Sequence, residues 1–176
     1  MEHSLRSTRL VLQKIVPTDL DDLVDLDSDP EVMRFISEGV PTPRSDYVGR
    51  DGLLARMCAY ADEPYGYFSA RFEDRFAGWF HLRPSVADGS MLELGYRLRR
   101  EFWGLGLATE GARRLCDLAF DTLNQEAVDA CAVAENRASI QVMKKCGMTP
   151  VGRFVHPRVP IEVERYLVRR GDYRRS

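Results

Sequence analysis

Long apolar runs are missing from the sequence, and their absence excludes a membrane-spanning helix. The longest uninterrupted apolar stretches, such as 10–12 and 130–134, fall far below the roughly 18 residues that a spanning helix needs. The N-terminus also lacks a basic start that leads into an apolar segment, so we expect neither a membrane partner nor a secretory leader. The cytoplasm is therefore the expected location.

An excess of positive charge is missing as well. The chain has 25 lysines and arginines against 27 aspartates and glutamates, which gives a formal net charge of −2. Binding to nucleic acid through a general electrostatic field needs a basic surface, so nucleic acid is not an expected partner. Any anionic ligand must be held by a local site.

Cysteine and histidine are scarce, and their spacing does not fit a metal site. No two of the four cysteines form a Cys-x-x-Cys pair, which argues against a zinc knuckle and a disulfide framework. His81 and His156 have no second ligand at metal spacing. We therefore expect no metal, and we expect the cysteines to be small core residues: Cys58, Cys116, Cys131 and Cys146.

The chain of 176 residues is long enough for one domain with a sizeable core, and 44% apolar against 30% charged residues is typical of a folded protein. We find no internal repeat and predict a single domain over 1–176. Strand-like and helix-like segments alternate, which predicts an α/β fold: a mixed, mostly antiparallel sheet of about seven strands flanked by helices. The predicted strands are 8–16, 65–69, 76–82, 92–98, 128–134, 151–155 and 161–168, and the predicted helices are 18–26, 30–36, 45–60, 108–123 and 137–146.

A glycine-containing loop, 103–109, connects the strand 92–98 to the helix 108–123. Glycines let the backbone approach a ligand, and the free N–H groups of a helix N-terminus bind phosphate. Thr109 stands where a dinucleotide-binding fingerprint has its third glycine, and no Gly-x-x-x-x-Gly-Lys run is present. Dinucleotides and nucleoside triphosphates are therefore disfavoured, while a simple tight turn stays possible.

These residues resemble the GNAT superfamily of acyl-coenzyme A dependent N-acyltransferases, in its RimJ/RimL-like branch. The loop Trp-Gly-Leu-Gly-Leu-Ala-Thr at 103–109 is similar to the acetyl-CoA loop of that branch. Three further segments resemble it: Thr-Arg-Leu-Val-Leu at 8–12, Asp-Pro-Glu-Val-Met at 29–33, and 136–148, which begins Asn-Arg-Ala-Ser and ends Lys-Cys-Gly-Met. The resemblance covers almost the whole chain.

The resemblance implies acetyl-CoA as cosubstrate and two central strands, 92–98 and 128–134, that splay apart to receive its pantetheine arm. Gly95 would suit the close approach of that arm. Lys144, Lys145, Arg99 and Arg100 are candidates for the 3′-phosphate. The implied cofactor-binding residues are Leu98, Trp103, Gly104, Leu105, Gly106, Leu107, Ala108, Thr109, Asn136 and Ser139.

Amide formation from a thioester needs a neutral amine, a path for its proton and an acid for the departing thiolate. The resemblance gives Glu93 the role of base, usually through water, and gives Ser139 a role beside the sulfur. Asn136 is expected to cap the helix 137–146 and to hydrogen-bond the pantetheine arm. No tyrosine is near Ser139 in sequence, so the identity of the general acid stays open.

The acceptor is open at this point. The RimJ/RimL-like branch implies the α-amine of a protein N-terminus, whereas similar chains acylate polyamines, aminoglycosides or other small amines. The segment 37–56 and the last two strands are expected to shape the acceptor site. A non-catalytic acyl-CoA-binding module is the rival from another class, and a homodimer is a further expectation.

Overall fold

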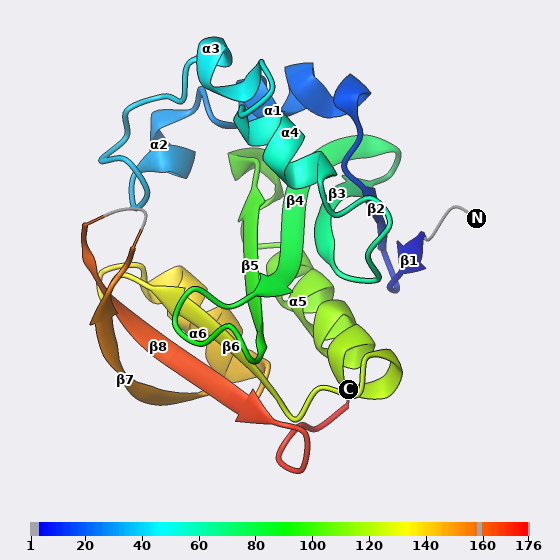
Figure 1. Cartoon of the computed structure of the whole chain (residues 1–176), viewed down its shortest axis with the longest axis vertical. Helices are drawn as coiled ribbons and strands as arrows, with labels where there is room; N and C mark the ends of the chain where they lie inside the picture. Colours follow the sequence, from blue (N-terminus) through cyan, green and yellow to red (C-terminus); the bar gives the residue numbers. More distant parts are fainter. Residues whose placement is uncertain (1–3, 158–159, 176) are drawn as a thin grey trace.

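The computed structural model describes residues 4–157 and 160–175, and these form one eight-stranded sheet in the order β1-β2-β3-β4-β5-β6-β8-β7 (Figure 1). Neighbouring strands run antiparallel, except that β5 and β6 run parallel. All seven predicted strands form, and a short strand at the N-terminal edge is the eighth. The strands are β1 Leu5–Arg6, β2 Leu10–Lys14, β3 Gly66–Phe72, β4 Arg75–Pro84, β5 Leu92–Leu98, β6 Ala127–Ala132, β7 Thr149–Val155 and β8 Glu162–Arg169.

The helices form two groups. Figure 1 shows α1 to α4 gathered at the top of the view, and α5 and α6 in its lower half. The first group packs on β3 and β4, whereas α5 packs on β2, β4 and β5, and α6 packs on β6 and α5. The helices are α1 Leu20–Leu26, α2 Pro30–Met33, α3 Arg44–Tyr47, α4 Leu53–Cys58, α5 Leu107–Asp117 and α6 Arg137–Lys145, and a π-helical turn, Leu118–Thr122, extends α5.

Two helix predictions are corrected by the structure. The predicted helix 45–60 is two short helices, α3 and α4, with a bend between them. Gly49 has a φ of 96°, which a helix does not contain, and a Cβ at Gly52 would lie 2.4 Å from the Tyr47 carbonyl oxygen. The predicted helix 30–36 ends at Met33, so Phe35 and Ile36 lie beyond its end.

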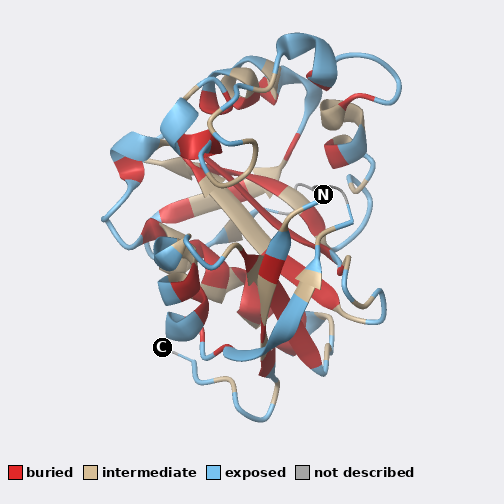
Figure 2. Ribbon diagram, turned by 90° about the vertical axis from the view of Figure 1, so that its left-hand side faces the viewer, coloured by how far each residue is buried: buried red, intermediate tan, exposed pale blue. Residues whose placement is uncertain are grey.

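A separate hydrophobic core lies on each face of the central strands. Phe80 and Leu82 of β4 pack with α5, where a Cβ at Gly111 would lie only 2.3 Å from the Phe80 ring. Phe76 and Trp79 belong to the second core, beneath α1 to α4. Figure 2 shows the buried residues concentrated on the central strands. Because β4 is buried on both faces, any polar side chain that it carries needs a partner inside the protein.

The central strands separate after a short contact. β5 pairs with β6 only through Leu92 with Val128 and Glu93 with Asp129, after which β6 continues along β8. The second half of β5 therefore has no strand on that side. This confirms the prediction that the two central strands splay apart.

Candidate active site

The loop between β5 and α5 is shaped by two glycines in the left-handed region. Gly104 has a φ of 76° and Gly106 a φ of 81°, values that residues with a Cβ rarely adopt. No atom lies within 4 Å of a Cβ placed at Gly104, and only the Arg9 guanidinium, at 3.6 Å, approaches one at Gly106. Gly106 is the N-cap of α5, and no side chain caps that helix. The N–H groups of its first turn are thus available to a ligand.

Ser7 and Arg9 of the N-terminal segment form hydrogen bonds to this loop and to the start of α5. Arg9 Nη1 donates to the Leu105 carbonyl at 3.0 Å, and Arg9 Nε donates to Glu110 Oε2 at 2.8 Å. Glu110 also accepts from Ser7 Oγ at 2.7 Å and from the Arg9 N–H at 2.6 Å. Burial raises the pKa of Glu110, but these hydrogen bonds from Ser7 and Arg9 outweigh it and lower the pKa overall. Glu110 is therefore ionised and anchored to Arg9.

A cavity of about 420 Å³, here called the loop groove, runs along this loop between α2, the end of β5 and α6. Trp103 lies at its edge, and its Nε1 donates to the Leu98 carbonyl at 2.8 Å. Leu105 is not among the lining residues, because its carbonyl is bonded to Arg9 and its side chain is exposed. The other nine predicted cofactor residues line the groove: Leu98, Trp103, Gly104, Gly106, Leu107, Ala108, Thr109, Asn136 and Ser139.

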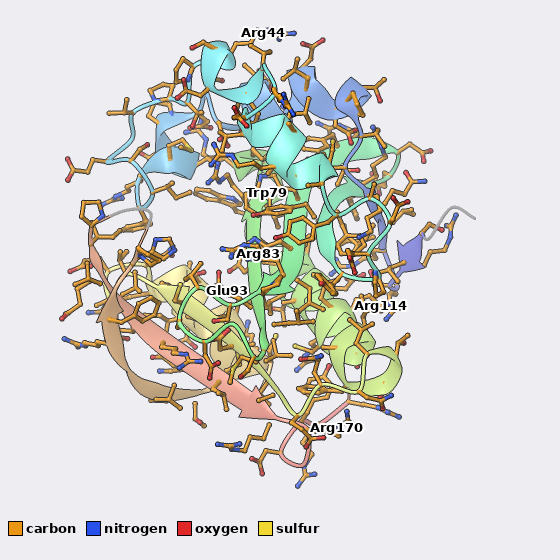
Figure 3. All side chains as sticks on the ribbon, viewed as in Figure 1. Arg44, Trp79, Arg83, Glu93, Arg114 and Arg170 are labelled. Carbon is orange, nitrogen blue, oxygen red and sulfur yellow. The ribbon has the colours of Figure 1, made fainter. Side chains whose placement is uncertain are left out.

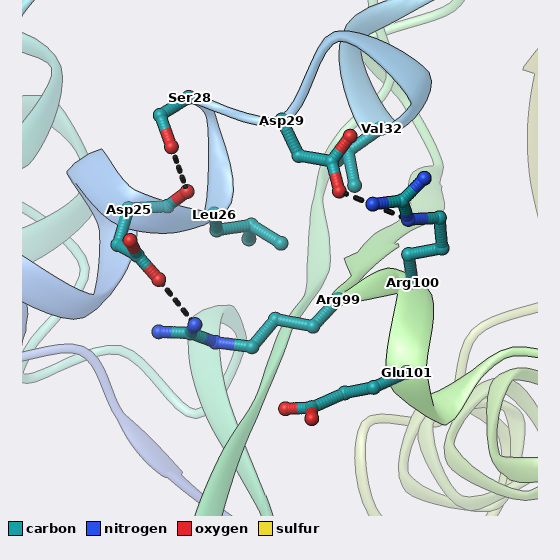
Figure 4. Close-up of a pocket in the computed structure, with 8 residues that line it drawn as sticks. All are labelled: Asp25, Leu26, Ser28, Asp29, Val32, Arg99, Arg100 and Glu101. Atoms are coloured by element: carbon teal, nitrogen blue, oxygen red, sulfur yellow. Dashed lines mark hydrogen bonds and ion pairs between the residues drawn. The ribbon is translucent and has the colours of Figure 1, made fainter.

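The candidate phosphate-binding cations lie in different places. Lys145 lines the loop groove, whereas Arg99 and Arg100 line a separate, charged pocket of about 320 Å³ (Figure 4). There Arg99 bonds Asp22 and Asp25, and the Arg100 Nε lies 3.3 Å from Asp29 Oδ2. Lys144 is exposed and does not line the groove, so the structure brings only Lys145 of the four candidates to it.

A second cavity of about 300 Å³, here called the inner chamber, opens between the splayed strands. β3 and β4 contribute Tyr67, Trp79, His81 and Arg83 to it. Further residues come from β5, β6, α6 and the β7–β8 hairpin. The inner chamber and the loop groove share the lining residues Phe35, Ile36, Tyr96, Arg97, Asn136, Ser139 and Val142. The two cavities therefore meet where β5 faces α6.

Glu93 is a buried carboxylate in this chamber, with three donors around it. Arg83 Nη2 lies 2.9 Å from Glu93 Oε1, His81 Nε2 lies 3.4 Å from the same oxygen, and the Val86 N–H donates to Oε2 at 3.2 Å. Burial raises the pKa of Glu93, but the hydrogen bond from His81 and the charges of His81 and Arg83 lower it to about 2. Figure 3 shows Trp79, Arg83 and Glu93 following one another along β4 and β5.

Gly95 makes room for the His81 ring, and the expected close approach of a pantetheine arm there stays a prediction. It pairs with His81 across β4 and β5, and a Cβ at Gly95 would lie 2.5 Å from the His81 ring. The absent side chain is thus explained by the imidazole, which occupies that space beside Glu93. Sequence reasoning missed His81 as a chamber residue, and the signal was its cross-strand position opposite the glycine.

Tyr96 is the other residue that sequence reasoning missed. Its hydroxyl lies 3.2 Å from Ser139 Oγ, across the opening between β5 and α6. Burial raises the pKa of Tyr96 to about 12, so the phenol keeps its proton. Tyr96 lies on the same face of the strand as Leu94 and Leu98, a position that indicated the core. Asn136 caps α6 as predicted, since its Oδ1 accepts from the Ser139 N–H at 3.2 Å.

Arg97, at the junction of both cavities, is held by a buried hydrogen-bond network. Its Nη1 bonds Asp27 Oδ1, and Tyr47 donates to Asp27 Oδ2 at 2.6 Å. The guanidinium also lies 5.1 Å from the centre of the Trp79 ring. The α1 end of the molecule thereby fixes a cation beside the meeting point.

The described residues contain neither a membrane span nor a metal cluster. Within 4–157 and 160–175, no helix is long and apolar enough to cross a bilayer. Over the same ranges, no group of three or more His, Cys, Asp or Glu residues is arranged to hold a metal ion.

Comparison with known proteins identifies the family. Residues 9–149 match the acetyltransferase (GNAT) domain. An Aspergillus fumigatus protein, FsC-acetyl coenzyme A-N(2)-transacetylase, is 31% identical over an alignment of 158 positions that covers 86% of this chain and 67% of that protein.

Solved structures of acetyltransferases share the fold. A Bacillus anthracis GNAT acetyltransferase superimposes with a TM-score of 0.79 at 21% identity, over 96% of this chain and 99% of that one. RimL, a ribosomal L7/L12 α-N-protein acetyltransferase in complex with coenzyme A, gives a TM-score of 0.78 at 14% identity, over 95% and 98%.

Proposed function

Since the chain belongs to the GNAT acetyltransferase domain family and is an acetyl-CoA-dependent acetyltransferase, we propose that it acetylates a primary amine directly, without an acyl-enzyme. We propose the α-amine of a peptide or protein N-terminus as the acceptor. The observation that carries the proposal is the junction of the two cavities at Tyr96, Arg97, Asn136 and Ser139. A thioester in the loop groove and an amine in the inner chamber would meet there.

The loop residues fit a pyrophosphate. The first-turn N–H groups of α5 have no side-chain cap, and the space beside Gly104 and Gly106 is open, so the backbone would bind the anion without a metal. Lys145 would add charge at the other side of the groove, and Asn136 and the free half of β5 would bind the pantetheine arm. Acetyl-CoA supplies the acetyl group as a thioester.

Glu93 is the proposed base, acting together with His81. The carboxylate is ionised at any pH well above 2, so it stabilises positive charge on the imidazole that it contacts. The proton of the amine would pass through water to this pair, where the imidazole takes it and Glu93 stabilises the resulting charge.

Ser139 and Tyr96 are the proposed donors to the departing sulfur. Both line both cavities, and their hydroxyls are within hydrogen-bonding distance of each other. When the Tyr96 hydroxyl donates to Ser139 Oγ, the hydrogen of Ser139 is left for the thiolate. The pair would thus supply the general acid that the sequence left open.

Several finer assignments belong to the same proposal. These are the RimJ/RimL-like branch, one acetyltransferase domain over 1–176, a cytoplasmic location and a homodimer. A small-molecule amine is the second candidate acceptor, favoured by the limited volume of the inner chamber, about 300 Å³.

The test is release of free thiol from acetyl-CoA in the presence of peptides and small amines, with mass spectrometry of the products. We expect thiol release that depends on the amine, and a single acetyl group on the peptide N-terminus. Binding of coenzyme A should raise the melting temperature, because a ligand at about 100 times its Kd adds roughly 2.7 kcal/mol. Stabilisation without thiol release for any amine would instead identify a non-catalytic binding module.

A further inference from the structure

The carboxylate and the two arginines that line the inner chamber already have partners in the protein. Among the described residues of its lining, Glu93 is the only acidic one. Arg83 bonds it at 2.9 Å, and the side chains of both residues are only 7% exposed. A buried carboxylate satisfied in this way has little attraction left for an additional cation.

The indole of Trp79, which also lines the chamber, is occupied in the same manner. An indole face is the strongest aromatic site for a cation. The guanidinium of Arg97 lies over Trp79, at 5.1 Å from the ring centre, and Asp27 holds Arg97 there. The His81 ring stacks beside the same indole, with ring centres 5.7 Å apart. Both features that would bind an additional ammonium group, the carboxylate and the indole face, therefore carry an arginine of the protein itself.

Apart from His156, the remaining described lining is apolar or carries only neutral polar groups. Ile36, Leu94, Val133, Met143 and Val163 contribute aliphatic surface from five different parts of the chain. Such a surface favours an apolar group, whereas a charged group placed against it loses hydration without gaining a partner.

We propose that the inner chamber selects monoamines whose body beside the reacting amine is apolar and uncharged, such as a peptide that begins with an apolar residue or an alkylamine. Polyamines and aminoglycosides are poor acceptors, because each brings a second ammonium group for which the described lining of the chamber offers no unpaired anion. This inference rests on the proposed function, and it assigns the substrate class of that same site.

The experiment compares pentylamine with cadaverine, which has the same carbon chain and a second terminal amine. Steady-state acetylation is measured at equal concentrations of neutral amine, and calorimetry measures amine binding to the coenzyme A complex. We expect kcat/KM to be at least about tenfold higher for pentylamine than for cadaverine. Calorimetry should show a higher Kd for cadaverine than for pentylamine. Equal kcat/KM and equal affinity for the two amines would overturn the inference and leave the proposed function standing. If no amine or peptide is acetylated, both fail.

Two arginine variants identify the cause of the selectivity. Arg83→Met removes the guanidinium that pairs with Glu93, so kcat/KM for cadaverine should rise relative to that for pentylamine. Arg83→Lys keeps a cation there and should retain the preference for pentylamine. Arg97→Met frees both the Trp79 face and Asp27 and should shift the ratio in the same direction. If Arg83→Met does not fold, Arg97→Met provides the test on its own. An unchanged ratio in both folded methionine variants would contradict the role of paired charges.

Discussion

The loop groove and the inner chamber lie on either side of one junction, but they are built in different ways. The proposed binding groups of the groove are backbone N–H groups of one short loop, 103–109, and its tryptophan is 47% exposed. The chamber is made of side chains from distant parts of the sequence, and its central carboxylate, Glu93, is only 5% exposed.

Because of this difference, changes in the loop groove should affect mainly ligand affinity, whereas changes in the inner chamber should also affect the stability of the fold. Backbone N–H groups in an open loop carry partial charges and remain hydrated without a ligand, so a change there alters affinity with little effect on folding. Buried full charges depend on their partners, so a change in the chamber alters both the rate and the free energy of unfolding. The predictions below test that separation.

The largest effect is expected from Gly106→Val in the loop groove. A β-branched side chain at a φ of 81° is strained and occupies the open space beside the α5 N-terminus. Loss of two hydrogen bonds to a charged ligand, each about 1.5–3 kcal/mol, corresponds to a roughly thousandfold weaker Kd for coenzyme A. Isothermal titration calorimetry measures this change in the Kd for coenzyme A.

Gly49→Val is the matched control. Gly49 also has a positive φ, 96°, and no atom lies within 4 Å of a Cβ placed on it, but it is located between α3 and α4. The variant should lose similar stability and keep its affinity for coenzyme A. If Gly106→Val binds coenzyme A as tightly as this control, the loop is only a connection.

The second largest effect is expected from Glu93→Gln in the inner chamber. Glu93 and His81 are proposed to act as the base together, so loss of the Glu93 carboxylate should lower kcat by about 100-fold with the Kd of coenzyme A unchanged. The deficit should shrink at high pH, where more of the amine is neutral. A pH–rate profile with the shape and height of the wild type would remove Glu93 from the mechanism.

The same variant should change the acid stability. The pKa of Glu93 is lower in the folded state, about 2, than its ordinary value of 4.5, so its ionisation stabilises the fold above pH 4.5. That contribution, about 3 kcal/mol from the pKa difference, is lost as the pH falls from about 5 to about 2. Urea unfolding across this range should show a steeper loss in the wild type than in Glu93→Gln.

A smaller effect is expected at the junction itself. Ser139→Ala and Tyr96→Phe should each lower kcat about tenfold with little change in the KM for acetyl-CoA, since the contact matters as charge develops on sulfur. The double variant should be no slower than either single one, because the two hydroxyls act as a unit. Additive losses would show that they act separately.

Asn136→Ala is the control for that pair, because it changes the same helix turn without removing either hydroxyl. It should cost about 0.5–2 kcal/mol as a lost N-cap, and it should weaken coenzyme A binding. A fall in kcat alone, with stability and affinity retained, would contradict the assignment of Asn136 to capping and cofactor binding.

The sequence predicted the loop groove better than the inner chamber. The loop 103–109 and the Asn136 cap were predicted because their functional groups lie within a few residues of one another. The pairs of the chamber join residues far apart, such as Arg97 with Asp27 and Tyr96 with Ser139, so only tertiary contacts of β5 with α1 and α6 bring them together. Strand periodicity indicated the correct face for Glu93 but could not identify its partners. The prediction of one helix over 45–60 failed for a local reason, since the backbone turns at Gly49 and folds Gly52 back against the Tyr47 carbonyl.

The smallest effect is expected from substitution of Arg9, which bonds the loop 103–109 at the Leu105 carbonyl. Its bond to the Leu105 carbonyl fixes that peptide plane, and in a trans peptide the Gly106 N–H then points away from Arg9. Arg9→Met should raise the KM for acetyl-CoA about three- to fivefold with kcat retained, because an exposed pair contributes about 0.5–1 kcal/mol. Arg9→Lys keeps the charge but not the fork that binds Leu105 and Glu110 together, so it should restore only part of the affinity. Glu110→Gln keeps the bond to Leu105 and should have the smaller effect. If Arg9→Met lowers thermal stability while the KM is unchanged, Arg9 supports the fold and does not position the loop.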